Sequence, residues 1–191
     1  SELIGNIERD ANSAKKYWHF IKLMGRSATH VALECALQTQ PNITLISEEV
    51  AANKTPLGEI VEYIANIVAK RAEAGKNFGV ALIPEGLIEF IPEMKSMISN
   101  LNDTLALVED DDDYKTLTSQ EERIKFIESK LDSNNASVFA SLPKSIQSQL
   151  LMDRDPHGNV QVSKIETEKL LVEMVQTKLC EMAKTGQYKG K

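Results

Sequence analysis

Residues 17–26 read YWHFIKLMGR, an apolar run that ends in a methionine, a glycine and an arginine. The run is typical of a buried strand, and a helix is predicted to begin at Ser27. At such a junction a glycine lets the backbone approach a ligand closely, and the helix start offers unpaired N–H groups with a partial positive charge. Arg26 adds a planar, permanently charged fork that suits a phosphate or a carboxylate. The pattern therefore predicts an anion-binding site at Met24, Gly25 and Arg26.

The first hundred residues alternate between helical and extended patterns. The helical period predicts helices over 2–13, 27–38, 57–74 and 87–101, the last kinked or interrupted at Pro92. Apolar runs predict strands over 17–24, 43–46 and 78–83. Strands joined by helices form right-handed crossovers, so we expect an α/β fold with a three-layer, Rossmann-like parallel sheet.

Some buried faces and helix ends can also be predicted. The first two helices are expected to bury two apolar sets, Leu3, Ile4 and Ile7, then Val31, Ala32, Cys35 and Ala36. Thr55 is expected to cap the helix over 57–74, with Pro56 in its first turn and Gly75 after its end. A last helix is predicted from about residue 164, with a capping box of Ser163 and Glu166. Its buried stripe is predicted to contain Leu170, Leu171, Met174, Val175 and Leu179.

A change in composition near residue 108 divides the chain. Residues 109–113 are all acidic, and we interpret them as a solvated loop that is mobile or poorly packed. A polar helix is predicted over 117–131 and a loop over 133–135. We therefore expect three parts: an α/β portion over 1–107 that carries the predicted anion-binding site, a mainly helical insertion over 108–160, and a C-terminal helix in 161–191 that packs back on the α/β core.

Composition limits the kinds of partner. The net charge of −6 argues against a nucleic-acid or anionic membrane surface. No apolar run reaches the roughly 20 residues that span a bilayer, and the first residues carry no signal-peptide pattern, so we expect a cytoplasmic protein. Cys35 and Cys180 form no metal or redox motif, and we predict no metal ligands.

Ligands of open parallel sheets bind at the carboxyl ends of the strands. Those ends carry residues 24–26, 47–49 and 84–86. Lysines and an arginine are expected to gather around the site: Lys15, Lys16, Lys22 and Arg26. Cations at one strand end and carboxylates at the others suit a ligand with a phosphate and hydroxyl groups, such as a sugar phosphate.

Two of these residues have a structural alternative. Glu85, held between a proline and a glycine, either accepts hydrogen bonds from ligand hydroxyls or caps the next helix. Arg26 either binds the ligand or forms a structural salt bridge. The residues alone leave both alternatives open.

Five segments together resemble the pyrophosphate-dependent phosphofructokinases in their long form. They are residues 15–20, 24–28, 33–39, 83–87 and 155–171, in the same order as in that family. The resemblance implies a glycolytic phosphotransferase that forms fructose 1,6-bisphosphate from fructose 6-phosphate and pyrophosphate, with Mg²⁺. The helical segment over 108–160 is similar to the insertion of the long form.

The resemblance also implies residue roles. Met24, Gly25 and Arg26 match the family's sugar-phosphate motif, in which the arginine also lies near the transferred phosphoryl group. Glu85 matches a glutamate that holds fructose hydroxyls. Lys16 and Tyr17 match a pair that reaches the substrate site of a neighbouring subunit, so a homo- or hetero-oligomer is implied.

Two motifs of that family are missing from these 191 residues. One is a Gly-Gly-Asp-Asp donor-site motif, and the other is a Thr-Ile-Asp-x-Asp motif whose aspartate is the general base. We therefore expect a central portion of the enzyme that is inactive alone. Three points stay open: whether the donor is pyrophosphate or ATP, whether the chain is an ATP-dependent relative, and whether it is a non-catalytic regulatory or sugar-phosphate-binding subunit.

Overall fold

The computed structural model describes residues 1–24, 29–108, 114, 116–117, 119–154, 158–188 and 190. Three parallel strands form its sheet, in the order β1-β3-β2: β1 (Trp18–Leu23), β2 (Ile43–Thr44) and β3 (Gly79–Pro84). β1 pairs with β3 along its whole length, from Trp18 opposite Gly79 to Leu23 opposite Pro84. The predicted parallel sheet is confirmed. β3 is the central strand because it pairs with β1 along one edge and with β2 along the other. It is apolar along its whole length because helices cover both of its faces.

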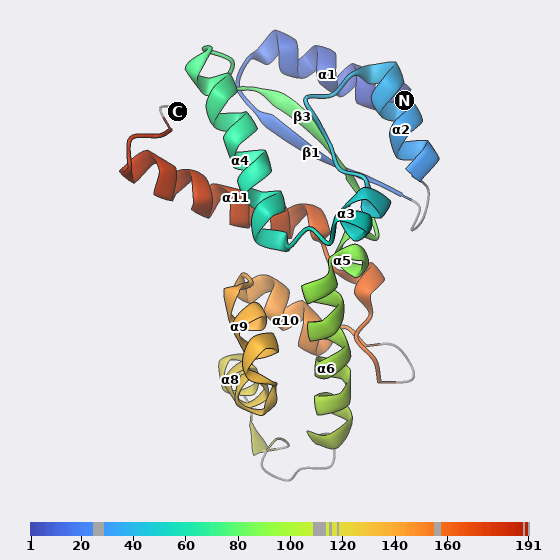
Figure 1. Cartoon of the computed structure of the whole chain (residues 1–191), viewed down its shortest axis with the longest axis vertical. Helices are drawn as coiled ribbons and strands as arrows, with labels where there is room; N and C mark the ends of the chain where they lie inside the picture. The colour runs from blue at the N-terminus through green and yellow to red at the C-terminus, as the bar shows by residue number, and fades with distance from the viewer. Residues whose placement is uncertain are drawn as a thin grey trace.

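Helices cover both faces of the sheet (Figure 1). α1 (Glu2–Ala14) and α2 (Thr29–Thr39) lie on one face, and α4 (Leu57–Glu73) and α11 (Thr167–Lys184) lie on the other. Alternate side chains of β3 supply the two cores: Val80 and Leu82 pack with α1 and α2, whereas Ala81 and Ile83 pack with α4 and α11. The predicted three-layer α/β fold is therefore confirmed.

The lower part of the molecule in Figure 1 is built of helices alone, whereas the sheet lies in the upper part. α3 (Ser47–Asn53) follows β2, and α5 (Leu87–Phe90) follows β3. The predicted interruption at Pro92 is confirmed, since α6 (Pro92–Val108) begins with that proline. Further along the described residues come α8 (Gln120–Lys130), α9 (Ser133–Ser141) and α10 (Lys144–Met152), which together we call the helical unit. A short 3-10 helix, η1 (Val162–Lys164), then leads to α11.

The helical unit shares one continuous core with the sheet. Buried residues of this core come from the helical unit, from α6 and from the sheet with its covering helices. They include Phe139 of α9, Leu150 of α10, Leu101 of α6, Leu171 of α11 and Ile83 of β3. Because the contacts are continuous, the helical unit and the sheet are expected to unfold together.

Several predicted ends and faces are wrong. Leu3 is 78% exposed and Val31 is 37% exposed, although Ile4, Ala32 and Cys35 on the same helices are buried. Within the described chain β1 pairs with another strand on one side only, so its residues are half-buried rather than buried. β2 ends at Thr44, two residues before the predicted end, because α3 begins at Ser47.

The errors at helix starts have a common cause. At α4 the predicted cap by Thr55 is wrong, because the N–H of Leu57 donates instead to Oε1 of Glu93, 36 residues away, at 2.6 Å. At α11 the predicted capping box is wrong, because the Glu166 side chain bonds to Gln149 and Lys169. In both cases a tertiary partner replaces the local one.

The loop predicted over 133–135 is also wrong. α9 begins at Ser133, and the carbonyl of Asp132 accepts the N–H of Ala136 at 2.7 Å. Burial of Phe139 in the core holds this helix despite its polar start. The acidic run over 109–113 lies outside the described residues, so its predicted mobility stays a prediction.

Candidate functional site

The carboxyl ends of β1 and β3 meet at one edge of the sheet. Leu23 lies opposite Pro84, and the N–H of Glu85 donates to the carbonyl oxygen of Leu23 at 3.0 Å. Met24 and Glu85 therefore leave neighbouring strands at the same level. Gly25 and Arg26 lie outside the described residues, so the prediction that Arg26 and Glu85 line one cleft stays a prediction.

The turn that carries Glu85 is well anchored. Gly86 is buried and precedes α5, whose first residues, Leu87 and Ile88, are buried in the main core. Glu85 itself is half-buried, whereas Met24 is exposed. A half-buried carboxylate on a fixed turn can present its oxygen atoms to a ligand with little loss of conformational entropy.

The acidic residues after β2 also lie at this edge. α3 begins at Ser47, directly after the strand, and α3 is in contact with α5. Glu49 lines a cavity of about 340 Å³ formed by residues of β2, α3 and α4, together with Thr44, Asn53 and Tyr63. The carboxyl ends of β2 and β3 thus carry carboxylates, as the sequence predicts, whereas the predicted cation after β1, Arg26, lies outside the described residues.

The other end of β1 carries two of the predicted site residues. Lys16 and Tyr17 precede β1, and the carbonyl of Tyr17 accepts the N–H of Gly79 at 3.2 Å. A six-residue strand is roughly 20 Å long, so this pair and Met24 lie at opposite ends of the sheet. Tyr17 is 63% exposed. The structure therefore does not bring Lys16 and Tyr17 into the same site as Glu85.

The predicted cluster of cations is wrong in part. Lys15 ends α1 with a left-handed backbone and lies beside Lys16 at the amino end of β1. Lys22, by contrast, lies opposite Ile83, two residues before Met24. Of these three lysines, only Lys22 belongs to the carboxyl end of the strand.

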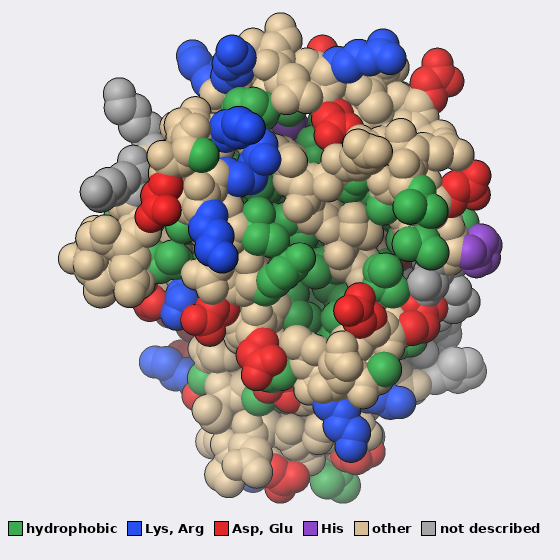
Figure 2. All heavy atoms as spheres, turned by 45° about the horizontal axis from the view of Figure 1, so that its top comes forward, with side chains coloured by type: hydrophobic (Ala, Val, Ile, Leu, Met, Phe, Trp, Pro, Cys, Tyr) green, Lys and Arg blue, Asp and Glu red, His purple; other side chains and the backbone are tan. Residues whose placement is uncertain are grey.

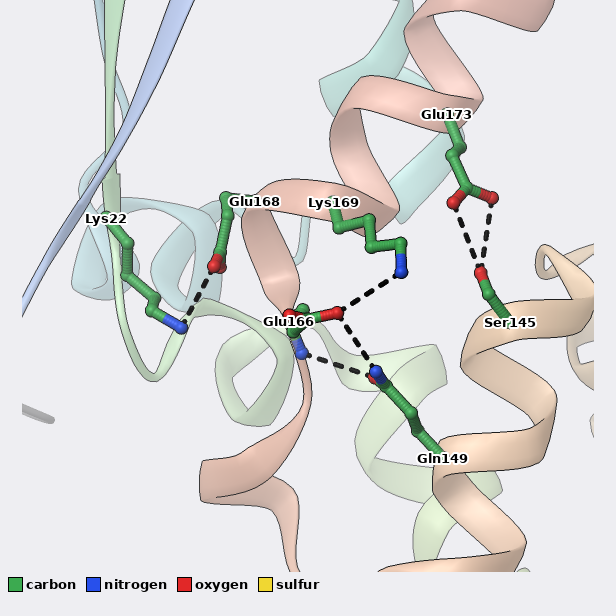
Figure 3. A network of polar contacts seen from close by, with 7 residues as sticks. All are labelled: Lys22, Ser145, Gln149, Glu166, Glu168, Lys169 and Glu173. Carbon is green, nitrogen blue, oxygen red and sulfur yellow. Dashed lines mark hydrogen bonds and ion pairs between the residues drawn. The ribbon is translucent and has the colours of Figure 1, made fainter.

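Lys22 has a partner that the sequence did not predict. Its Nζ lies 3.1 Å from Oε1 of Glu168, in the first turn of α11, and Figure 3 shows the two side chains pointing toward each other. Glu168 is 146 positions away from Lys22 in the sequence (168 minus 22). The sequence gives one hint of such a partner: Lys22 is a lysine within a largely apolar run.

The pKa of Glu166, which lies two residues before Glu168, is shifted from its ordinary value. A hydrogen bond from the amide of Gln149, and then the bond and the charge of Lys169, lower the pKa of the Glu166 carboxyl below its ordinary value. Lys22 contributes a smaller effect in the same direction. The start of α11 is therefore a polar junction between β1 and α10 (Figure 3).

Positive and negative side chains are mixed on one face of the molecule. On the face in Figure 2, basic, acidic and hydrophobic side chains are interspersed, with several lysines and arginines around the upper rim. That face therefore lacks a single broad field of positive charge, and a bound phosphate would depend on nearby cations.

The described part of the chain shows neither a metal cluster nor a membrane span. Among the residues that the structure describes, no group of three or more His, Cys, Asp or Glu side chains could hold a metal ion. Within the same residues, no helix combines the length and the apolar character that a membrane span requires.

Comparison with known proteins gives the family. No protein-family model matches the chain. The whole chain is 56% identical to the pyrophosphate–fructose 6-phosphate 1-phosphotransferase of Porphyromonas gingivalis and covers 34% of it. Against Arabidopsis thaliana, the whole chain is 50% identical to subunit beta 1 and 41% identical to subunit alpha 2 of the enzyme of that name, covering 32% and 29% of them. The chain thus spans about a third of the length of the curated relatives it matches. Identity at this level along the whole chain confirms the resemblance, and the chain belongs to the pyrophosphate–fructose 6-phosphate 1-phosphotransferase family.

Proposed function

We propose that this chain forms the fructose 6-phosphate-binding part of an enzyme that transfers a phosphoryl group from pyrophosphate to the 1-hydroxyl of that sugar. One observation carries the proposal. The bond from the Glu85 N–H to the Leu23 carbonyl places the ends of β1 and β3 side by side, so a phosphate motif and a carboxylate follow neighbouring strands.

The proposed roles follow from the chemistry of the side chains. Arg26 supplies a fixed positive charge to the sugar phosphate and to the phosphoryl group in transfer. Met24 and Gly25 bring the backbone close to the ligand. Glu85 accepts hydrogen bonds from the fructose hydroxyls and so orients the sugar. Phosphoryl transfer depends mainly on such positioning and charge neutralisation.

Lys16 and Tyr17 are proposed to act in a second site. They lie at the amino end of β1, where Tyr17 is exposed, so their side chains are accessible to a neighbouring subunit. Relatives in Arabidopsis thaliana are named as alpha and beta subunits. We therefore propose that the enzyme works as a homo- or hetero-oligomer in which this pair completes the substrate site of a neighbour.

We assign no residue of this chain to the phosphoryl donor, to the metal ion or to the role of general base. Mg²⁺ would neutralise charge on pyrophosphate, but the described residues offer no cluster of metal ligands, so we assign none of them to it. The chain has no motif for the general base. We therefore propose that this chain binds the sugar phosphate but does not turn it over, and that it acts in the cytoplasm.

Calorimetric titration of the purified chain with fructose 6-phosphate tests the proposal. We expect weak but measurable binding, and Arg26→Ala should weaken it about tenfold or more because a charged hydrogen bond to phosphate is lost. Arg9→Ala, which removes an exposed arginine of α1, is the matched control and should leave affinity unchanged. Glu85→Gln is paired in the same way with Glu62→Gln on the exposed side of α4.

A coupled assay with Mg²⁺ and either pyrophosphate or ATP completes the test. We expect no fructose 1,6-bisphosphate with either donor. Turnover that disappears in Arg26→Ala would contradict the proposal that this chain lacks the catalytic base. Equal loss of affinity in Arg26→Ala and Arg9→Ala would contradict the proposed site.

A further inference from the structure

The ion pair of Lys22 and Glu168 connects the end of β1 to the start of α11. The two charged atoms are 3.1 Å apart, and their side chains are only 25% and 28% exposed. Oε2 of Glu168 is buried and, among the described residues, has no hydrogen-bond partner. Lys22 is therefore the main compensation for a partly desolvated carboxylate, and a pair in this situation resists opening more than an exposed one.

The pair lies where it can control the geometry of the proposed site. Lys22 is one residue before Leu23, whose carbonyl accepts the N–H of Glu85. It is also two residues before Met24. A restraint on Lys22 therefore restrains the last backbone bond between β1 and the turn that carries Glu85.

The helical unit reaches the same place through α10. Gln149 Nε2 donates to Oε2 of Glu166 at 3.1 Å, and the Glu166 N–H donates to Oε1 of Gln149 at 3.4 Å. Figure 3 shows this two-way pair between α10 and the start of α11, close to Glu168. The helical unit thus fixes the residue that lies two positions before the partner of Lys22.

We propose that Lys22 and Glu168 are positioning residues for the sugar-phosphate site, and that Gln149 lets the helical unit hold them in place. The mechanism is a chain of direct contacts: α10 holds Glu166, the first turn of α11 places Glu168, and Glu168 holds the end of β1 through Lys22. Their role toward a ligand rests on the proposed function, whereas the restraint itself does not.

Amide hydrogen exchange, followed by NMR on the 191-residue chain, measures this restraint directly. The N–H of Glu85 reports the end of the β1–β3 pairing near Lys22, and the N–H of Gly79, bonded to Tyr17, reports its other end. Lys22→Met should lower the protection factor of Glu85 about fivefold, as loss of a partly buried ion pair implies, and leave that of Gly79 unchanged. Lys22→Arg keeps the charge and should restore most of the protection at Glu85.

A second pair of variants tests the connection to the helical unit. Gln149→Ala should lower protection at Glu85 about twofold, since the restraint is transmitted through one more contact. Ser145→Ala is the matched control, because Ser145 also joins α10 to α11 but bonds to Glu173, more than a turn further along the helix. It should leave the Glu85 amide unchanged.

The outcomes separate this inference from the proposed function. Equal loss of protection at Glu85 and Gly79 would mean general destabilisation and would overturn the inference, as would a lack of rescue by Lys22→Arg. Equal effects of Gln149→Ala and Ser145→Ala would overturn the part played by the helical unit. Absence of fructose 6-phosphate binding by the unsubstituted chain would refute the proposed function alone, since the exchange rates are measured without ligand.

Discussion

Gly79, the first residue of β3, has almost no room for a side chain. A Cβ at this position would lie 2.6 Å from Oδ1 of Asn42 and 2.6 Å from Cζ3 of the Trp18 ring. Favourable contacts between heavy atoms begin near 3.5 Å, so Gly79→Ala requires both neighbours, or the strand itself, to move by up to about 1 Å.

Neither neighbour can move without loss. Oδ1 of Asn42 accepts the N–H of Val80 at 2.9 Å, and the guanidinium of Arg71 lies 5.7 Å from the centre of the Trp18 ring. Overpacking of this kind costs about 1–3 kcal/mol. Alanine also lowers the conformational entropy of the unfolded chain, which stabilises the folded state by about 0.4–1 kcal/mol. The difference between the two ranges runs from about 0 to 2.6 kcal/mol, and we expect Gly79→Ala to lower the free energy of unfolding by about 1–2 kcal/mol, in the middle of that interval, because both neighbours are held by other contacts.

Urea denaturation followed by far-UV circular dichroism measures this change. Gly58→Ala is the matched control, because Gly58 is an exposed residue of α4 and a Cβ added there would have no atom within 4 Å. It should raise the free energy of unfolding by up to about 0.5–1 kcal/mol. If Gly79→Ala proved as stable as the unsubstituted chain, the close packing of Trp18 and Asn42 around the start of β3 would be refuted.

Three further predictions concern the core, the sheet edge and the junction. Phe139→Ala should lower the free energy of unfolding by about 3–5 kcal/mol. In this variant the fluorescence of the single tryptophan, Trp18, should give the same urea midpoint as circular dichroism, because the helical unit and the sheet share one core. Two different midpoints would contradict the continuous core. Asn42→Ala should lower the free energy of unfolding by about 1–3 kcal/mol in urea titration, because the Val80 N–H loses its partner, whereas Asn6→Ala on the exposed side of α1 should have little effect. The lowered pKa of Glu166 means that its contribution to stability is present above the unfolded-state pKa and is lost as the pH falls through the folded-state pKa. In a ¹³C NMR titration, Gln149→Ala should raise the pKa of Glu166 toward its ordinary value, and an unchanged value would refute Gln149 as the main cause.

The features that depend on local pattern could be predicted from the sequence. α4 follows the helical period and ends before Gly75, which has a φ of 74°. The three strands and their parallel direction follow from alternation with helices. The pattern at the strand ends identified residues 24–26 and Glu85 as site candidates, and the family resemblance gave them roles; the structure places Met24 and Glu85 at neighbouring strand ends.

The features that depend on distant residues could not be predicted. Glu93 caps α4 from another helix, and Gln149 holds Glu166 across the junction, so local capping rules failed at both places. In the order β1-β3-β2, β1 is paired with another described strand on one side only and is therefore half-buried. No local sequence pattern encodes this order. Lys15 and Lys16 are close to Lys22 in the sequence, but the extended strand separates them from it.

The most direct test of the account is an NMR titration of the ¹⁵N-labelled chain with fructose 6-phosphate. We expect the largest shifts at the amides of Met24 and Glu85, at the carboxyl ends of β1 and β3, with little change at Gly79 at the other end of the sheet. Inorganic sulfate at the same concentration is the control for simple anion binding, and it should leave the Glu85 amide unaffected because it has no sugar hydroxyls. Binding that leaves the amides of Met24 and Glu85 unshifted, or shifts of equal size with sulfate, would contradict the claim that the two strand ends form a sugar-phosphate site.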